Sequence, residues 1–269
     1  MAEVLGGQVA IVTGGSRGIG RAIALRFARD DAAVVVSDTN EAGGHETVRL
    51  VEAAGGRAAF CRADVANEVQ ARELIAFATR TFGGLSVLVN NASAPHPPTE
   101  GIAGWFDSLQ TDLVGTLHMT RWAVEAMRAA AASGQAGGSI VNISSISALW
   151  QGRTTSGGFP GYDVAKAGVI RMTTGLARDL TPLGIRINCL APGWIDSDGP
   201  RQYWESLTPA ERIERGVPSR LLTTTAVADI VARIAANQSL NGRIVVWWSE
   251  DRPRLVTWGD RGYRDFTNF

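Results

Sequence analysis

The chain has 269 residues with 26 basic and 26 acidic side chains, and 45% of its residues are hydrophobic. This composition is typical of a globular protein with a sizeable core. It lacks the basic excess expected of a protein that binds nucleic acid or an anionic membrane surface. No apolar run approaches the ~18 residues of a membrane helix, and the N-terminus does not resemble a signal peptide. We therefore expect a cytoplasmic protein with no nucleic-acid or membrane partner.

Cysteine and histidine usage gives no sign of metal or disulfide chemistry. Cys61 and Cys189 lie far apart in apolar runs, which predicts buried free thiols in a reducing compartment. The three histidines, His45, His96 and His118, lack the spacing of metal ligands. No metal site is predicted.

Short apolar runs alternate with stretches of helical periodicity along the whole chain. We expect strands at 8–13, 32–38, 57–65, 85–93, 138–145, 184–193 and 242–248. We expect helices at 18–31, 40–56, 67–84, 105–133, 161–180 and 223–237. This alternation predicts parallel strands covered by helices on both faces, which right-handed crossovers make a doubly wound sheet, or Rossmann fold. Since no linker or repeat is visible, residues 1–269 are predicted to form a single α/β domain.

A glycine-rich segment, "TGGSRGIG" at 13–20, joins the first strand to the first helix. Its glycines, Gly14, Gly18 and Gly20, follow the spacing G-x-x-x-G-x-G rather than the usual dinucleotide fingerprint G-x-G-x-x-G. A turn here exposes backbone N–H groups at a helix N-terminus, where the helix dipole favours an anion. The segment therefore predicts a site for the pyrophosphate of a dinucleotide.

Acidic residues end the second and third strands at the same edge of the sheet. Asp38 lies 20 residues after Gly18 and can accept hydrogen bonds from ribose hydroxyls. Because a 2′-phosphate would meet a like charge there, Asp38 favours NAD(H) over NADP(H), although Arg17 could pair with such a phosphate. A helix N-cap is the structural alternative for Asp38. Asp64, followed by Val65, could bond an adenine amino group.

Taken together, the motifs resemble those of the short-chain dehydrogenase/reductase family over nearly the full length of the chain. The matching segments are "TGGSRGIG", Asp38, "DV" at 64–65, "NNAS" at 90–93, "IVNISS" at 140–145, "YDVAK" at 162–166 and "INCLAPGWI" at 187–195. No single motif is specific, but their order and approximate intervals are those of the family.

The resemblance implies that Tyr162 is the catalytic acid/base, Lys166 its partner and Ser145 the hydroxyl that orients the carbonyl. A free tyrosine, with a pKa of about 10, ionises too weakly to be a base at neutral pH. A nearby ammonium and a cationic nicotinamide would lower that pKa. A step of four residues places Tyr162 and Lys166 on one helix face. Strand alternation turns Ser144 the other way.

The resemblance also implies NAD as cofactor, with NADP less favoured, a small-molecule substrate, and a homo-oligomer, either tetramer or dimer. The expected cofactor-binding residues are Gly14, Ser16, Arg17, Gly18, Ile19, Gly20, Asp38, Asp64, Val65, Asn91, Ala92, Ser93, Tyr162, Lys166, Pro192, Gly193, Ile195 and Ser197.

The main departures of the sequence from the family pattern are the following. Asp112 stands where the family usually carries an asparagine. An ionised Asp112 would form a salt bridge with Lys166 and weaken the effect of the ammonium on Tyr162, so Asp112 is a candidate fourth catalytic residue. The segment 146–160 before Tyr162 is long. A tail at about 249–269 replaces the family's usual ending and is predicted to pack across a neighbouring subunit.

We therefore expect an NAD(H)-dependent oxidoreductase that interconverts a secondary alcohol and a ketone. The 146–160 loop and a lid at about 194–216 are expected to set specificity, with Trp150, Trp194, Tyr203 and Trp204 lining an apolar pocket. Two alternatives remain open. One is a 3-oxoacyl-carrier-protein reductase using NADP(H), and the other is a dinucleotide-sensing protein without turnover, which would be expected to have lost the tyrosine or the lysine.

Overall fold

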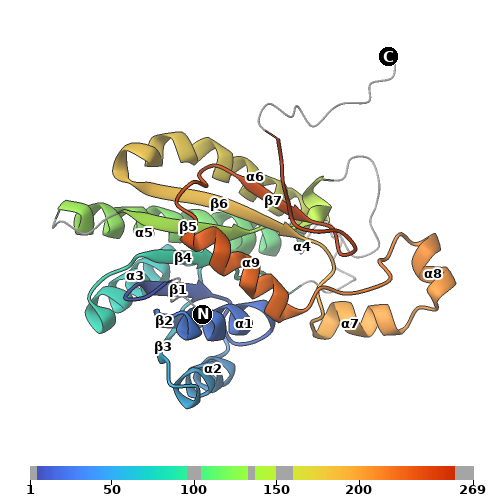
Figure 1. Cartoon of the computed structure of the whole chain (residues 1–269), viewed down its shortest axis with the longest axis horizontal. Helices are drawn as coiled ribbons and strands as arrows, with labels where there is room; N and C mark the ends of the chain where they lie inside the picture. Colours follow the sequence, from blue (N-terminus) through green and yellow to red (C-terminus); the bar gives the residue numbers. More distant parts are fainter. Residues whose placement is uncertain (1–4, 96–103, 133–136, 150–159, 258–269) are drawn as a thin grey trace.

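The computed structural model describes residues 5–95, 104–132, 137–149 and 160–257. Its centre is an eight-stranded sheet with the order β3-β2-β1-β4-β5-β6-β7-β8, covered by helices on both faces (Figure 1). Every neighbouring pair is parallel except β7 and β8. The strands are β1 Val9–Thr13, β2 Ala33–Asp38, β3 Arg57–Arg62, β4 Val87–Asn90, β5 Gly138–Ile143, β6 Ile185–Pro192, β7 Ile244–Trp247 and β8 Arg254–Leu255. The predicted doubly wound α/β fold is confirmed.

The helices follow the strands in the alternating order that the sequence predicts. They are α1 Gly18–Arg29, α2 Glu41–Ala53, α3 Glu68–Phe82, α4 Gly104–Ser108, α5 Thr116–Ala132, α6 Pro160–Leu180, α7 Asp198–Glu205, α8 Pro209–Glu214 and α9 Thr224–Ala236. Side-chain caps fix several starts: Asn40, Asn67 and Thr223 each accept a backbone N–H of the first turn. A left-handed Gly83 ends α3.

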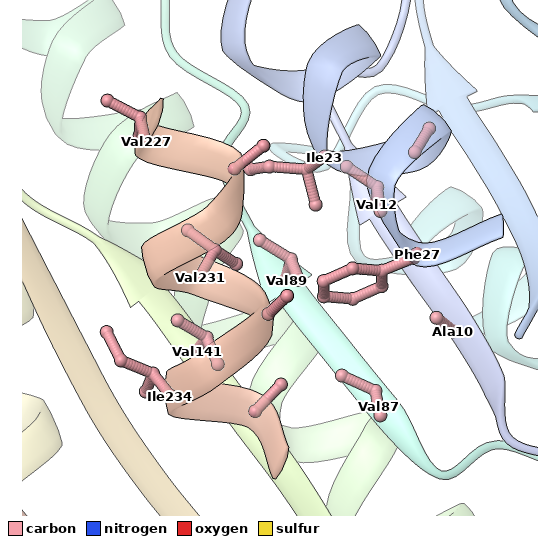
Figure 2. Packing of buried hydrophobic residues seen from close by; sticks show 14 of the residues in the cluster. Ala10, Val12, Ile23, Phe27, Val87, Val89, Val141, Val227, Val231 and Ile234 are labelled. Carbon is pink, nitrogen blue, oxygen red and sulfur yellow. The ribbon is translucent and has the colours of Figure 1, made fainter. Parts of the chain in front are cut away.

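Alternation along the strands builds a separate core on each face of the sheet. On β1, Ala10 and Val12 face α1 and α9, where Phe27 and Val231 are fully buried (Figure 2). The intervening Val9 and Ile11 face α3, α5 and α6. Each large apolar side chain buried in this way contributes about 1.5–3 kcal/mol to stability.

The strand order positions the functional residues. From β1 the chain moves outward to β2 and β3, and then returns to place β4 on the other side of β1. Ligands of doubly wound sheets bind beyond the carboxyl ends of the strands at such a reversal. The segments that follow β1, β2, β4 and β5 therefore converge on one edge of the sheet.

The structure adds local detail that the sequence pattern does not contain. The expected helix at 105–133 is interrupted by a π-helical stretch, η1 (Leu109–Gly115). The expected lid contains α7 and α8. The described part of the tail packs on its own sheet: β8 pairs antiparallel with β7, and the Arg243 guanidinium donates to the Val256 carbonyl at 2.9 Å. Residues 258–269 and the segment 150–159, with Trp150, lie outside the described residues.

Both cysteines are free thiols, as predicted, but only Cys189 is buried. Cys61, on β3, is partly exposed because the outer faces of this edge strand are incompletely covered. Within the described ranges, no helix is long and apolar enough to cross a membrane. In the same ranges, no three His, Cys, Asp or Glu side chains gather closely enough to hold a metal ion.

Candidate active site

The turn between β1 and α1 can be formed only with glycine at several positions. Gly14 and Gly18 adopt positive φ angles of 65° and 54°, a region that residues with a side chain rarely occupy. A Cβ on Gly20 would lie 2.1 Å from the Gly14 carbonyl oxygen. The chain therefore passes close to itself, and the first N–H groups of α1 are left open to the cleft.

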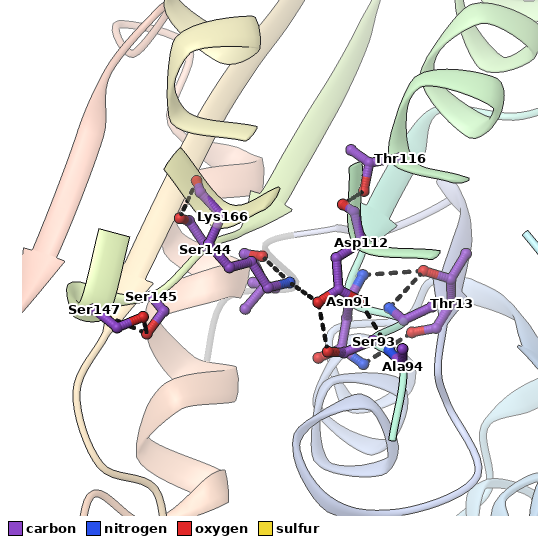
Figure 3. A network of polar contacts seen from close by, with 12 residues as sticks. Thr13, Asn91, Ser93, Ala94, Asp112, Thr116, Ser144, Ser145, Ser147 and Lys166 are labelled. Carbon is purple, nitrogen blue, oxygen red and sulfur yellow. Dashed lines mark hydrogen bonds and ion pairs between the residues drawn. The ribbon is translucent and has the colours of Figure 1, made fainter. Parts of the chain in front are cut away.

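The end of β4 holds this turn in place. The Asn91 side-chain amide donates to the carbonyls of Thr13 at 2.9 Å and Gly14 at 3.1 Å. In return, the Thr13 hydroxyl oxygen accepts the backbone N–H groups of Asn91 and Ala92 at 3.0 and 3.1 Å (Figure 3). "NNAS" thus fixes the glycine turn through hydrogen bonds, in addition to lining the cleft.

Asp38 ends β2 with its carboxylate beside the turn. One oxygen accepts the Ser16 N–H at 3.0 Å, and the other accepts the Asn40 N–H at 2.9 Å. Arg17 is exposed next to it. The glycine cradle, the N-terminus of α1 and this carboxylate together fit the pyrophosphate and ribose of a dinucleotide.

A second group of polar side chains gathers where β5 and α6 meet the cleft. The Lys166 ammonium is buried, donates to the Ile143 carbonyl at 3.1 Å and lies 5.3 Å from the centre of the Tyr162 ring. Ser145 Oγ accepts the Ser147 N–H at 3.2 Å, and the Ser147 hydroxyl lies 3.0 Å from it. Ser144 points the other way, as predicted, and its hydroxyl donates to the Lys166 carbonyl at 2.8 Å.

Asp112 lies on η1 and is fully buried behind the cleft. Its carboxylate is 3.8 Å from the Lys166 ammonium, so the expected salt bridge is present. The same carboxylate accepts the Ser93 hydroxyl at 2.9 Å and the Ala94 N–H at 2.8 Å (Figure 3). Asp112 therefore connects the loop after β4 to Lys166.

The predicted lowering of the Tyr162 pKa is wrong for the protein without a bound dinucleotide. Burial is the largest influence and raises the pKa of Tyr162, because it disfavours the phenolate. The Lys166 charge and a hydrogen bond with Ser145 lower this pKa, whereas the charges of Asp112 and Asp163 raise it. The net direction is upward. The spacing in the sequence showed the lysine but not the burial of the phenol.

One continuous cleft joins the two groups of residues and brings together most of the predicted site. Its lining includes Gly14, Ser16, Arg17, Gly18, Ile19, Gly20, Asp38, Asp64, Val65, Asn91, Ala92, Ser93, Ser145, Tyr162, Gly193, Ile195 and Ser197. The predicted residues Asp112, Lys166 and Pro192 do not line it. Asp112 and Lys166 are buried behind the lining, and Pro192 is the last residue of β6.

The segment 194–216, which is expected to form a lid, contributes two stacked aromatic side chains to the cleft. Trp194 and Tyr203 line it and stack with their ring centres 5.9 Å apart and their planes 21° apart. Within the described part of the chain, Trp204 does not line the cleft, contrary to prediction. Its indole N–H donates to the Pro218 carbonyl at 2.8 Å, and its ring packs under the Arg212 guanidinium. Trp204 therefore ties α7 to the segment at Arg212 and Pro218.

Sequence reasoning missed Ser147 altogether. It lines the cleft and contacts Ser145 through both its N–H and its hydroxyl. Its position two residues after Ser145 was the only available signal. A 3₁₀ turn, Ile146–Leu149, folds the backbone back toward Ser145, and no residue pattern in this segment predicts that turn.

Comparison with known proteins identifies the family. Residues 8–207 match the family model described as short chain dehydrogenase. This chain is a short-chain dehydrogenase. As a member of that family it is an oxidoreductase that acts on CH–OH groups, and the family uses a nicotinamide cofactor, NAD or NADP.

Individual relatives of this short-chain dehydrogenase include enzymes named for cyclic alcohols. It is 35% identical over 240 residues to a cis-4-hydroxycyclohexanecarboxylate dehydrogenase from Sinomonas cyclohexanicum, covering 87% of this chain and 86% of the relative. It is 36% identical over 207 residues to an L-fucose dehydrogenase from Bos taurus, covering 75% and 69%. A crystal structure from Burkholderia xenovorans, assigned to the short-chain dehydrogenases/reductases, superposes with a TM-score of 0.79 at 30% identity and covers 91% of this chain and 96% of its own.

Proposed function

We propose that the protein is an NAD(H)-dependent oxidoreductase that interconverts a cyclic secondary alcohol and the corresponding ketone, with Tyr162 as the acid/base. The observation that carries the proposal is that Tyr162 lines the same cleft as the glycine turn, with the buried Lys166 ammonium directly behind its ring. When bound, the nicotinamide supplies the acceptor or donor of the hydride. The steps assigned below to protein side chains concern the proton.

Tyr162 handles that proton at the substrate oxygen. Because its pKa is raised by burial, the phenol is protonated at neutral pH and ready to donate to an alkoxide when a ketone is reduced. In the oxidation direction the phenol must lose the proton, which the Lys166 charge favours. Positive charge on an oxidised nicotinamide would act in the same direction. Proton handling of this kind contributes roughly 10²–10⁴-fold to rate.

Ser145 holds the substrate oxygen beside the phenol. Ser147 directs an N–H at the Ser145 oxygen, so a lone pair of that oxygen is occupied and the Ser145 proton is left for an acceptor in the cleft. A hydroxyl placed in this way stabilises charge that develops on a carbonyl oxygen. Ser145 is thus the donor to the substrate and Tyr162 the group that exchanges the proton.

Asp112 acts through Lys166 as a positioning residue. Its carboxylate neutralises part of the ammonium charge and ties Lys166 to the loop at Ser93 and Ala94. Because the Asp112 charge raises the Tyr162 pKa, the phenol keeps its proton more tightly than it would beside a neutral asparagine. This arrangement favours the acid role of Tyr162 at neutral pH.

The preference for NAD(H) rests on Asp38. Its carboxylate is held by two backbone N–H groups and lines the cleft beside the glycine turn. A free lone pair on each oxygen can accept a ribose hydroxyl, whereas a 2′-phosphate would face a negative charge without a compensating cation fixed at this position. Arg17 is exposed and makes no ion pair among those found in the described residues.

The proposed substrate class rests on the stacked aromatic side chains and on the relatives. The stacked Trp194 and Tyr203 both line the cleft, and a flat aromatic face suits the face of a saturated ring better than a long chain. Two of the relatives described above are named for ring-bearing alcohols, a hydroxycyclohexanecarboxylate and fucose.

The proposal is tested by a substrate screen that follows absorbance of the reduced nicotinamide. Cyclohexanols, cyclic sugars and matched open-chain secondary alcohols are each offered with NAD and with NADP at equal concentration. The expected result is turnover of a cyclic alcohol with NAD and a lower kcat/KM with NADP. Faster turnover of open-chain alcohols would overturn the substrate class, and equal or better use of NADP would overturn the cofactor assignment.

A further inference from the structure

The carbonyl groups of the glycine turn are all accounted for by contacts with the protein. Asn91 binds the carbonyls of Thr13 and Gly14, as described above. The next two carbonyls, those of Gly15 and Ser16, are bound by residues outside every motif discussed so far. A carbonyl turned into the cleft would repel a phosphate, so the groups that bind these two oxygens bear directly on anion binding.

Thr47, on α2, holds the Gly15 carbonyl. It is fully buried, and its hydroxyl lies 2.9 Å from the Gly15 oxygen and 3.1 Å from the Gly43 oxygen. The Arg21 Nε–H donates to the same hydroxyl at 3.0 Å. Since a guanidinium can only donate, the Thr47 hydroxyl accepts from Arg21. Its single proton is directed at the nearer of the two carbonyls, that of Gly15.

Arg21, on α1, holds the Ser16 carbonyl. One of its terminal nitrogens donates to the Ser16 oxygen and lies 3.3 Å from the Gly43 oxygen. The N–H of Ser16, in turn, donates to Asp38. Ser16 is thus fixed at both ends: Arg21 binds its carbonyl, and Asp38, the proposed ribose-binding acid, binds its N–H.

We propose that Thr47 and Arg21 are positioning residues for the phosphates of the dinucleotide. Thr47 and Arg21 bind the carbonyls of Gly15 and Ser16 and so fix the peptide groups that carry the next N–H groups. The Ser16 N–H donates to Asp38, and Arg17 stands at the N-terminus of α1 in the lining of the cleft. The inference rests on the proposed function, because it takes a dinucleotide as the ligand. It assigns a role in phosphate binding to α2, a helix that lies outside the glycine-rich segment.

Thr47→Val is the decisive variant, because it removes the hydroxyl without changing charge and with little change in volume. The Gly15 carbonyl then lacks its side-chain donor, and the Arg21 Nε–H lacks its acceptor. The expected result is an increase of about tenfold in the Kd for NADH, measured by fluorescence titration, as expected for losing one well-made hydrogen bond. Thr47→Ser, which keeps the hydroxyl, is expected to stay within about twofold of the wild type.

A matched control separates positioning from a general loss of structure. Thr79, on α3, also bonds the carbonyl four residues earlier, at 3.3 Å, but lies outside the cleft. Thr79→Val should leave NADH binding unchanged.

Adenosine, which has no phosphate, serves as the second probe. The Kd for adenosine should be the same in Thr47→Val as in the wild type. An equal loss of adenosine and NADH binding would show a merely structural role and overturn the proposal.

Arg21→Lys provides an independent test if Thr47→Val does not fold. Lysine keeps the charge but cannot bond Thr47 and Ser16 together, so NADH binding should again weaken about tenfold. Unchanged NADH affinity in either folded variant overturns the positioning role and leaves the proposed function intact. A wild-type protein that binds neither NADH nor NADPH would instead overturn the proposed function itself.

Discussion

Replacing Gly20 by alanine tests the glycine turn at the point of closest approach. A Cβ there would lie 2.1 Å from the Gly14 carbonyl oxygen and 2.7 Å from the Asn91 amide nitrogen, whereas real Cβ contacts essentially never fall below 3.0 Å. The backbone must therefore move by about 1 Å, and such overpacking costs about 1–3 kcal/mol. For a chain of this size each kcal/mol corresponds to about 2–4 °C in Tm, so we expect Tm to fall by about 2–12 °C.

The assay combines thermal unfolding with NADH titration, and Gly175→Ala is the matched control. Gly175 lies in α6, and a Cβ added there would meet no other atom within 4 Å, so alanine should stabilise the helix by about 0.5–1 kcal/mol. Gly20→Ala should also weaken NADH binding at least tenfold, because the displaced N–H groups no longer converge. The reasoning is refuted if Gly20→Ala melts with the wild type or binds NADH equally well.

Four further changes have defined outcomes. Asp112→Asn removes a charge that raises the Tyr162 pKa, so this pKa falls and the acidic limb of the pH–rate profile for alcohol oxidation, where the rate rises with pH, should move to lower pH; a shift to higher pH contradicts the assignment. Asp38→Ser should raise the KM for NAD about tenfold or more and narrow the preference over NADP, as steady-state kinetics with both cofactors will show. Burial raises the pKa of Cys189 to about 12, so its thiol should react with a disulfide reagent at pH 8 only after unfolding; rapid native labelling would count against this burial. Phe27→Ala empties a fully buried site and should lower the free energy of unfolding by about 3–5 kcal/mol in urea titration, whereas a loss below 1 kcal/mol would show that the core between α1 and α9 collapses to fill the space.

The sheet and the glycine turn could be predicted because local patterns determine both. Strands and helices alternate with clear periodicity, and Gly14, Gly18 and Gly20 mark a turn in which two positive φ angles and one close approach require glycine. The Tyr162–Lys166 pair was likewise visible, since four residues make one helical turn. These features depend on neighbours within a few residues of each other.

The features that could not be predicted depend on contacts between distant segments. The π-helical stretch that carries Asp112 leaves no mark in the periodicity, because it changes the hydrogen-bond register and not the residue pattern. Trp204 turns away from the cleft because Pro218 and Arg212 offer it partners. The upward direction of the Tyr162 pKa comes from burial by surrounding elements, a quantity that the spacing to Lys166 does not contain.

The proton role of Tyr162 is tested most directly by single-turnover kinetics of Tyr162→Phe with a substrate found in the screen. Phenylalanine keeps the ring and removes only the hydroxyl, so NADH affinity should remain within about threefold of the wild type. The rate of appearance of reduced nicotinamide should fall by roughly 10²–10⁴-fold. Dinucleotide binding together with an unchanged single-turnover rate would contradict the account.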